Sequence, residues 1–466
     1  MVPFDPEQLS VLAGGRWTVR PATPLAGWHF DSRQLKAGEI FVAIKTDRRD
    51  GHEFLAAAQE AGAGAAVVAQ AQPKVTLPQL VVADPLRAWQ AVAREQRRRF
   101  CGPVVGISGS AGKTSTKDLL ACLLGGVEGG VLATEGNFNN HLGVPLTLTR
   151  LAPERHRYAV IEAGTSAPGE LQPLARMIDP EVAIITLIAP AHTEALGGLE
   201  GVAREKATLP AAARPGGVAI ITAATAVYPP FRDLGVRRLV LERAAVLRPV
   251  EPPADRVNFS VAQRGRETAV ALADGLSPPV VFTLERVSEG MAENAALAIC
   301  AARWLGVPNE LIQERLHAWR PTALRGEVRW CGERLLYLDC YNANPASMAD
   351  ALANFATLAP AEVPRLYVLG CMEELGPTAA EHHRTLGRSL MLRGADRVLV
   401  IGSHAAAVAT GAAERNGDAV SVEVVTTLDP IVEALSGWAG AVLVKGSRRY
   451  ALEQAVAAIA AEVAHA

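Results

Sequence analysis

The segment GISGSAGKTSTK, from Gly106 to Lys117, contains the residue types needed to hold a nucleoside triphosphate. Gly109 and Gly112 let the backbone turn so that several N–H groups face a phosphate. Lys113 supplies a positive charge for the outer phosphates, and the hydroxyl of Thr114 can meet Mg²⁺. The residues expected against the nucleotide in this loop are Gly109, Ser110, Ala111, Gly112, Lys113, Thr114 and Ser115.

The surroundings of this loop also fit nucleotide binding. An apolar run from Pro103 to Ile107 leads into it, and helix-forming residues follow from about Thr114 to Leu124. The amino end of that helix brings its positive dipole end to the same place. The full Walker pattern has glycine at the position of Ile107, so an ordinary strand–turn–helix connection with a surface lysine is the alternative. Spacing and context together favour a nucleoside triphosphate site.

Three further side chains could hold metal ions or charge beside this loop. Glu162 ends the apolar strand YAVIEAG, where a carboxylate is well placed for Mg²⁺, although it could instead cap the turn that follows. His192 follows the apolar run VAIITLIAPAH and is either a metal or phosphate ligand or a plain loop histidine. Lys206 falls on the predicted helix in GLEGVAREKATLP and, taken alone, indicates a solvent-facing lysine.

Polar residues also gather in three loops. They are Asn139 and Asn140 in TEGNFNNHLGVP, Asn342 and Asn344 in DCYNANPAS, and Ser32 and Arg33 near the amino end. Asparagine donates and accepts hydrogen bonds at once, which suits contacts to sugars or peptides. Asparagine and glycine are equally the usual residues of long turns, so a purely structural role stays open.

Length and composition predict a multidomain α/β protein. The chain has 466 residues, 49% of them hydrophobic, which is enough for about three domains with sizeable cores. A net charge of −2 gives no general electrostatic case for nucleic acid or an anionic membrane. The start, MVPFDPEQLS, lacks a basic stretch followed by an apolar one, and no apolar run is long enough to span a bilayer. We therefore expect a cytoplasmic protein that binds no nucleic acid and does not insert into membranes.

Short apolar runs alternate with helical patterns almost throughout, which favours α/β layers. We expect three domains, at 1–100, 101–320 and 321–466, with a linker at Arg320-Pro321-Thr322. Within the second domain, the proline-rich stretch from about Pro229 to Pro279 predicts a small antiparallel appendage. The basic run from Arg94 to Arg99 is interpreted as the solvated end of a helix.

With these motifs assembled, the chain resembles the Mur ligase family over essentially its whole length. DSR, GEIFVAI and DGHEF resemble that family's uridine-nucleotide domain, and GSAGKTSTK with TEGNFNNHLGVP its central ATPase domain. DCYNANPASM, LGCMEELG and Lys445-Gly446-Ser447 resemble its carboxy-terminal domain, and YNANP is specific to one branch. The resemblance implies a central, mostly parallel P-loop-type sheet flanked by an N-terminal α/β domain that binds the UDP-sugar-peptide and a Rossmann-like C-terminal domain.

That branch adds D-alanyl-D-alanine to UDP-N-acetylmuramoyl-tripeptide in the cytoplasmic stage of peptidoglycan synthesis, using ATP and Mg²⁺ and an acyl-phosphate intermediate. The resemblance implies the same activity here, and we expect a monomer. By matching positions it implies that Lys113 holds the outer phosphates, that Thr114 and Glu162 hold one Mg²⁺, and that His192 lies near a second. It also implies that Lys206 is carbamylated by CO₂ into an anionic metal ligand.

The same matching assigns the remaining positions. It implies that Asn139 and Asn140 lie where the muramoyl peptide meets ATP, and that Ser32 and Arg33 contact the uridine nucleotide. It implies that Asn294, Arg325, Asn342 and Asn344 close over the nucleotide.

Several positions depart from the family pattern, most of them near the base of the nucleotide. Gly290 and Met291 stand where the family has a histidine and an asparagine that help to recognise adenine. Neither residue can offer those side-chain hydrogen bonds, so we expect weaker base discrimination and turnover with other purine triphosphates. The other departures are Leu187, the segment 222–225 and Cys371.

Two alternatives remain open from the sequence. One is a related ATP-dependent amide ligase with a different acceptor, as in folylpolyglutamate synthases and cyanophycin-type ligases, and the match to the uridine domain speaks against it. The other is a degenerate, non-catalytic binding protein with a Mur-like fold, which the departures near the base motivate. Retention of one coherent charge set speaks against that second alternative. The set consists of Lys113, Thr114, Glu162, His192 and Lys206.

Overall fold

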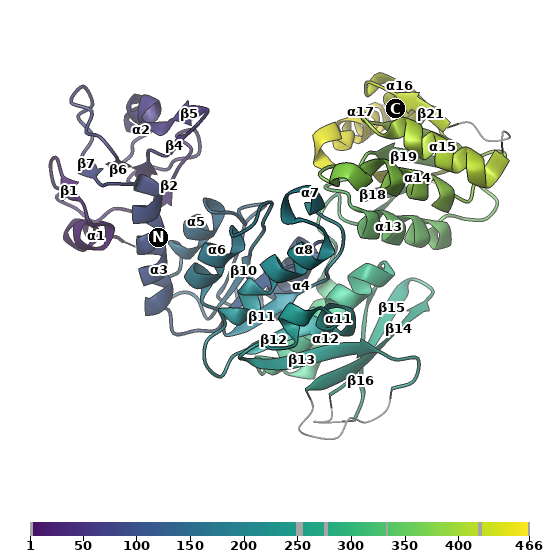
Figure 1. The fold of residues 1–466 in the computed structure, drawn as a ribbon, viewed down its shortest axis with the longest axis horizontal. Helices are drawn as coiled ribbons and strands as arrows, with labels where there is room; N and C mark the ends of the chain where they lie inside the picture. The colour runs from purple at the N-terminus through teal and green to yellow at the C-terminus, as the bar shows by residue number, and fades with distance from the viewer. Residues whose placement is uncertain (1–2, 248–254, 275–277, 332–333, 418–421, 465–466) are drawn as a thin grey trace.

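Three β-sheets follow one another along the chain, each with its own helices (Figure 1). The computed structural model describes residues 3–247, 255–274, 278–331, 334–417 and 422–464. The N-terminal sheet has the order β1-β7-β6-β3-β2, the central sheet β16-β15-β14-β13-β12-β11-β8-β10-β9, and the C-terminal sheet β17-β18-β22-β19-β20-β21. In the described ranges, no helix is both long and apolar enough to cross a membrane.

The N-terminal sheet is small and mostly parallel. Its strands are β1 (Arg16–Trp17), β2 (Trp28–His29), β3 (Ile40–Val42), β6 (Ala65–Val68) and β7 (Gln79–Val81), with a short hairpin of β4 (Lys45–Thr46) and β5 (Arg49–Asp50). Its helices are α1 (Pro6–Ala13), η1 (Gly51–Phe54), α2 (Leu55–Glu60) and α3 (Pro85–Arg99). Every residue of β3 and β6 is buried, which explains why these strands read as continuous apolar runs.

The central sheet is parallel from β9 to β14 and holds the phosphate loop at its middle. Its strands are β8 (Val104–Ser108), β9 (Val131–Ala133), β10 (Tyr158–Glu162), β11 (Val182–Ile185), β12 (Val218–Thr222), β13 (Arg237–Arg243), β14 (Arg256–Arg264), β15 (Glu267–Ala273) and β16 (Val280–Glu285). Its helices are α4 (Lys113–Leu123), α5 (Gly143–Leu148), α6 (Leu171–Ile178), α7 (Thr193–Leu196), α8 (Leu199–Lys206), α9 (Thr208–Ala211), α10 (Ala223–Ala226), η2 (Pro229–Phe231), α11 (Glu289–Trp304) and α12 (Asn309–Ala318). Because β8 lies between β10 and β11, the loops after these strands meet at one edge of the sheet.

The small antiparallel appendage expected between about Pro229 and Pro279 is confirmed only in part, because β14 to β16 are antiparallel but extend the central sheet. Strands β13 to β16 continue the central sheet, since β13 pairs in parallel with β12 and with β14, and only β14 to β16 are antiparallel. Buried side chains on β14 to β16, such as Phe259 and Phe282, belong to the same apolar cluster as α11. Three of the seven prolines in this stretch, Pro249, Pro252 and Pro253, fall outside the described residues.

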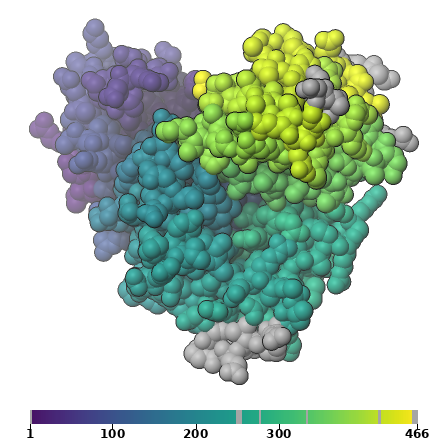
Figure 2. Space-filling view, turned by 45° about the vertical axis from the view of Figure 1, so that its right-hand side comes forward, coloured from purple at the N-terminus to yellow at the C-terminus, as the bar shows by residue number. Residues whose placement is uncertain are grey.

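The C-terminal sheet is parallel except for its edge strand β17. Its strands are β17 (Glu327–Cys331), β18 (Arg334–Asp339), β19 (Arg365–Gly370), β20 (Arg397–Ile401), β21 (Val422–Val425) and β22 (Ala441–Lys445). Its helices are α13 (Pro345–Leu358), η3 (Gly376–Thr378), α14 (Ala379–Ser389), α15 (Ala405–Asn416), α16 (Asp429–Ser436), η5 (Arg448–Tyr450) and α17 (Leu452–Ala464). The C-terminal residues rest on the central ones in the space-filling view (Figure 2).

Helix α3 joins the first two sheets, because it packs on both. Trp89 and Val92 lie in the apolar cluster of the N-terminal sheet, whereas Ala93 and Phe100 lie in a cluster with α6 and the central sheet. The helix begins at an Asp84 side chain that caps its first amides, with Pro85 in the first turn.

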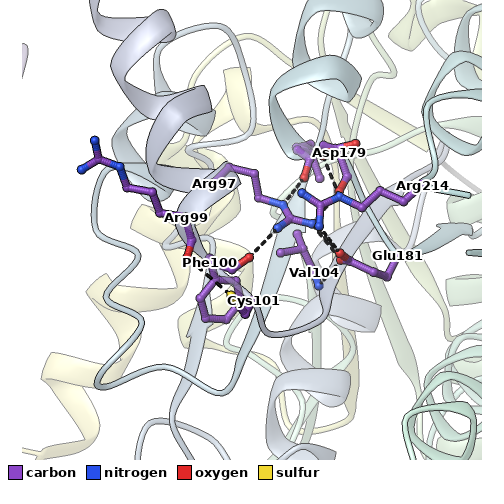
Figure 3. A network of polar contacts seen from close by, with 9 residues as sticks. Arg97, Arg99, Phe100, Cys101, Val104, Asp179, Glu181 and Arg214 are labelled. Carbon is purple, nitrogen blue, oxygen red and sulfur yellow. Dashed lines mark hydrogen bonds and ion pairs between the residues drawn. The ribbon is translucent and has the colours of Figure 1, made fainter. Parts of the chain in front are cut away.

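The basic run at the end of α3 was expected to be solvated, and for Arg97 this expectation is wrong. Arg97 is fully buried, and its guanidinium donates to the carbonyl oxygens of Ile178 (2.8 Å) and Asp179 (2.6 Å) and to both carboxylate oxygens of Glu181 (2.8 Å each) (Figure 3). Arg214 donates to the Glu181 carboxylate from the other side, at 2.8 Å. One member of the basic run therefore fastens α3 to the start of β11.

We expect replacement of Arg97 by methionine to lower the free energy of unfolding by about 2–4 kcal/mol, since several buried acceptors then lose their donor. The matched control is Arg99→Met on the same helix, because that side chain is exposed and pairs only with Glu95 at 3.3 Å. Its effect should stay within about 0.5 kcal/mol. Urea unfolding curves of the two variants measure the difference, and equal midpoints would contradict a fastening role for Arg97.

Candidate functional site

The phosphate loop has the backbone that its glycines allow. Gly109 and Gly112 have φ angles of 149° and 77°, in the region that favours glycine. A Cβ at Gly109 would stand 1.9 Å from the hydroxyl of Thr186, and one at Gly112 would stand 2.6 Å from the amide group of Asn294. Both positions therefore need glycine for space as well as for conformation.

Lys113 starts α4 and points back into the loop. Its ammonium donates to the carbonyl oxygen of Gly109 at 2.9 Å. Burial is the main reason why its pKa lies below the ordinary value, with Arg325 acting in the same direction and Glu162 opposing it. A cation held at this position can exchange its loop contact for a phosphate oxygen.

Glu162 is a buried carboxylate at the end of β10, with one oxygen paired and one unpaired. Its Oε1 accepts from the amide of Asn139 at 2.7 Å, whereas its buried Oε2 has no hydrogen-bond partner among the described residues. A buried carboxylate oxygen without a partner is costly unless a cation or a ligand meets it. With the nearby Thr114 hydroxyl it fits Mg²⁺, which usually takes one or two protein ligands and completes its shell with water and phosphate.

The described residues contain no group of three or more His, Cys, Asp or Glu side chains that could form a dedicated metal cage.

A cavity of about 360 Å³ lies between the phosphate loop and the C-terminal sheet. Its size falls within the range typical of small-molecule sites. Among the residues predicted for the site, it brings together Ser110, Ala111, Gly112, Lys113, Thr114, Ser115, Asn139, Glu162, Asn294, Arg325, Asn342 and Asn344.

The C-terminal side of the cavity comes from the ends of β18 and β22 and the start of α13. Asn344 caps α13 with its Oδ1 and donates from Nδ2 to the carbonyl oxygen of Ser110 at 3.2 Å, across the two domains. Lys445 is buried, pairs with Asp339 at 2.9 Å and donates to the carbonyl oxygen of Asn342 at 2.7 Å. Arg325 lies over the ring of Tyr341, 4.0 Å from its centroid.

His192 does not line this cavity. Its ring nitrogen Nδ1 pairs with the carboxylate of Glu374 from the C-terminal domain, and Thr193 donates to the carbonyl oxygen of Leu375 at 3.4 Å. His192 and Glu374 both have positive φ angles, 55° and 61°. A carboxylate on one ring nitrogen is the usual partner of a histidine whose other nitrogen binds metal, so the pairing leaves Nε2 suited to a metal ion.

Lys206 is buried, and the interpretation as a solvent-facing lysine is wrong. Burial, reinforced by repulsion from Lys113, lowers its pKa to about 7. The preceding Glu205 fixes this end of α8 by accepting from the amides of Gly169 (2.8 Å) and Leu171 (2.7 Å). The lysine is therefore held near the phosphate loop in a form that loses its proton near neutral pH.

The remaining predicted residues lie outside the cavity. Asn140 Oδ1 accepts from the amides of Leu142 and Gly143, both at 3.0 Å, as a turn residue does. In the N-terminal domain, Arg33 is exposed and pairs with Asp31 at 2.7 Å, which is the main reason why the pKa of Asp31 falls to about 2. Ser32 stands between them.

Three residues at the site were not singled out from the sequence. Tyr341 and Asp350 line the cavity, and Glu374 pairs with His192. Tyr341 is part of YNANP and could have been marked with it, whereas Asp350 is an ordinary-looking helical residue with no sequence signal.

Two family descriptions match the chain. The Mur ligase middle domain matches residues 107–238, and the Mur ligase glutamate ligase domain matches residues 325–448. The first match includes the phosphate loop, Glu162, His192 and Lys206. The second includes Asn342, Asn344 and Lys445.

The chain is also similar to individual proteins over nearly its full length. It is 33% identical over 436 residues to UDP-N-acetylmuramoyl-tripeptide--D-alanyl-D-alanine ligase of Escherichia coli K12, covering 92% of each chain. Among solved structures, MurF from Acinetobacter baumannii has a TM-score of 0.84 at 27% identity, covering 98% of this chain and 99% of that one. MurF from Thermotoga maritima, solved with ADP, shares the fold with a TM-score of 0.77 at 23% identity, covering 94% and 98%. The expected three-domain α/β fold is confirmed.

Proposed function

The chain belongs to the Mur ligase family, and from that membership we propose that it joins D-alanyl-D-alanine to UDP-N-acetylmuramoyl-tripeptide with ATP, in peptidoglycan synthesis. The observation that carries the proposal is the similarity to the E. coli ligase of that name, which runs through 92% of both chains. The family is one of ATP-dependent ligases, and the cavity between the phosphate loop and the C-terminal sheet suits a nucleoside triphosphate.

The proposed reaction has two steps. An oxygen of the tripeptide's terminal carboxylate attacks the γ-phosphorus of ATP, and ADP leaves, which gives an acyl phosphate. The amino group of D-alanyl-D-alanine then attacks the acyl carbon, phosphate leaves, and the nitrogen loses a proton. Most of the rate acceleration in such a reaction comes from charge neutralisation and positioning. The groups suited to these tasks are the Lys113 ammonium and the backbone amides of residues 110–114.

Metal binding is assigned to the same charge set. The Thr114 hydroxyl and Glu162 would hold one Mg²⁺, and His192 Nε2, oriented by Glu374, would serve a second. Bound Mg²⁺ would neutralise phosphate charge during transfer. The lowered pKa of Lys206 supports carbamylation, because only an uncharged amine reacts with CO₂.

The domain limits at 1–100, 101–320 and 321–466 follow as a proposal from the three successive sheets. The first domain would bind the uridine nucleotide near Ser32 and Arg33, with Asn139 and Asn140 near the junction of peptide and ATP. Asn294, Arg325, Asn342 and Asn344 would contact the nucleotide.

The deciding experiment is phosphate release with UDP-muramoyl-tripeptide, with and without D-alanyl-D-alanine. We expect turnover only with both, and a product whose mass is the sum of the two substrates less one water. Tripeptides ending in diaminopimelate and in lysine should be tested side by side, with L-glutamate as the alternative acceptor. Equal phosphate release without D-alanyl-D-alanine, or a product with glutamate alone, would contradict the proposed acceptor.

A further inference from the structure

The cavity has a polar end and a partly apolar end. At the polar end lie Lys113, Thr114 and Glu162. At the other end lie Val287, which is buried and precedes α11, and Met291 in the first turn of α11, which packs against the central core. A flat purine can pack on such flexible apolar side chains while its phosphates reach the loop. Asn294 stands between the two ends, one helical turn from Gly290 and next to Gly112.

Asp350 reaches this apolar end from the other domain. It lies on α13, is half-buried, and accepts from the backbone N–H of Gly290 through Oδ1 at 2.9 Å. A Cβ at Gly290 would stand 2.9 Å from the other oxygen, Oδ2. Glycine at 290 is therefore what lets the carboxylate come so close to α11, and Asp350 lines the cavity beside Met291.

This contact affects what would follow from placing the family's histidine and asparagine at positions 290 and 291. A histidine at 290 would require the flexible Asp350 carboxylate to shift, so Gly290→His with Met291→Asn would change the position of Asp350 as well as the residues at 290 and 291. Asp350 is the carboxylate that lines the cavity beside Gly290 and Met291.

An ionised carboxylate only accepts hydrogen bonds, and its two oxygens offer about four lone-pair sites, so Oδ2 keeps acceptor capacity. On its pairing edge guanine presents N1–H and the 2-amino group side by side, which match two carboxylate oxygens. Adenine presents one amino group next to the N1 acceptor, which a carboxylate repels. Hypoxanthine presents N1–H alone.

We propose that Asp350 is a specificity-determining residue that raises the affinity of this ATP site for purines with adjacent N–H donors, above all guanine, and so narrows its preference for adenine. The inference rests on the proposed function only in taking the cavity as the nucleotide site. In this proposal, Asp350 supplies hydrogen bonds to the base that the side chains at 290 and 291 cannot make.

The test is calorimetric binding of ADP, GDP and IDP, with Mg²⁺, to the full chain and to its variants. A charge-assisted hydrogen bond contributes enough for about a tenfold effect on affinity. We expect Asp350→Ala to lower the GDP-to-ADP affinity ratio about tenfold, with IDP changing less than GDP. Asp350→Asn keeps an acceptor for Gly290 but loses the charge, and should lower the ratio as well.

The matched control is Glu289→Ala, which removes an exposed carboxylate at the same helix end that pairs with Arg243. It should leave the ratio unchanged. If Asp350→Ala weakens all three nucleotides by the same factor, Asp350 only fastens the two domains and the inference is overturned. Binding of none of the three to the natural chain overturns it too. Failure of the proposed function would be detected in a different experiment, as absence of the amide product.

Discussion

Replacing Lys113 with alanine should lower kcat by at least about 10²–10³-fold, the usual effect of removing one group that stabilises transition-state charge. The ammonium is the charge at the start of α4 that can meet the outer phosphates, and its contact to Gly109 is one it can give up. The free energy of unfolding should change little, because the substitution keeps the helical position and removes one hydrogen bond, to the carbonyl oxygen of Gly109. Phosphate release with both substrates measures the effect, and a urea curve checks the fold.

Lys74→Ala is the matched control, since this lysine is exposed on the loop between β6 and β7 in the N-terminal domain. Its turnover should equal that of the natural chain. An Lys113→Ala variant with unchanged turnover would mean that the loop does not position the transferred phosphate, whatever else the cavity binds.

The elements that the sequence predicted well are those with one strong local signal. Apolar runs in the sequence predict strands at Val104–Ser108, Val218–Thr222 and Arg397–Ile401, and β8, β12 and β20 have these bounds, because each is a largely apolar run in a parallel sheet. The sequence also predicts a helix from about Pro85 to Phe100, and α3 begins at Pro85, after the Asp84 cap, and ends at Arg99. The short strands β1, β2, β9 and β21 are not predicted, because two to four residues carry too little periodicity.

Errors arose where a residue's environment is set by a distant part of the chain. Arg97 looks like its exposed neighbours, and only Ile178 and Glu181, about eighty positions away, make it a buried anchor. Lys206 likewise has the sequence context of a surface lysine, and its burial depends on the tertiary packing of α8, which contacts α6, α7 and α9. Asp350 matters because α13 crosses the start of α11, a contact between domains that no local pattern encodes.

Lys206 is the residue for which the structure most strengthens the expectation drawn from the resemblance. With a pKa of about 7, the amine is about one tenth uncharged at pH 6 and about nine tenths uncharged at pH 8. CO₂ reacts with the uncharged form, so stimulation of activity by bicarbonate should rise across this interval. The carbamate would turn a buried cation into an anion beside Lys113, which relieves the repulsion between the two lysines.

We therefore expect Lys206→Ala and the better-packed Lys206→Met to lose nearly all activity, and the alanine variant to regain part of it with formate or acetate. A short carboxylate can enter the space left by the side chain and replace the missing anion. Arg204→Ala, which removes an exposed cation from the same helix, should be fully active. In the natural chain, ¹³C-bicarbonate should give a carbamate NMR signal that both Lys206 variants lack. A fully active alanine variant would contradict the assignment, since a buried lysine that only fills space needs no anion in its place.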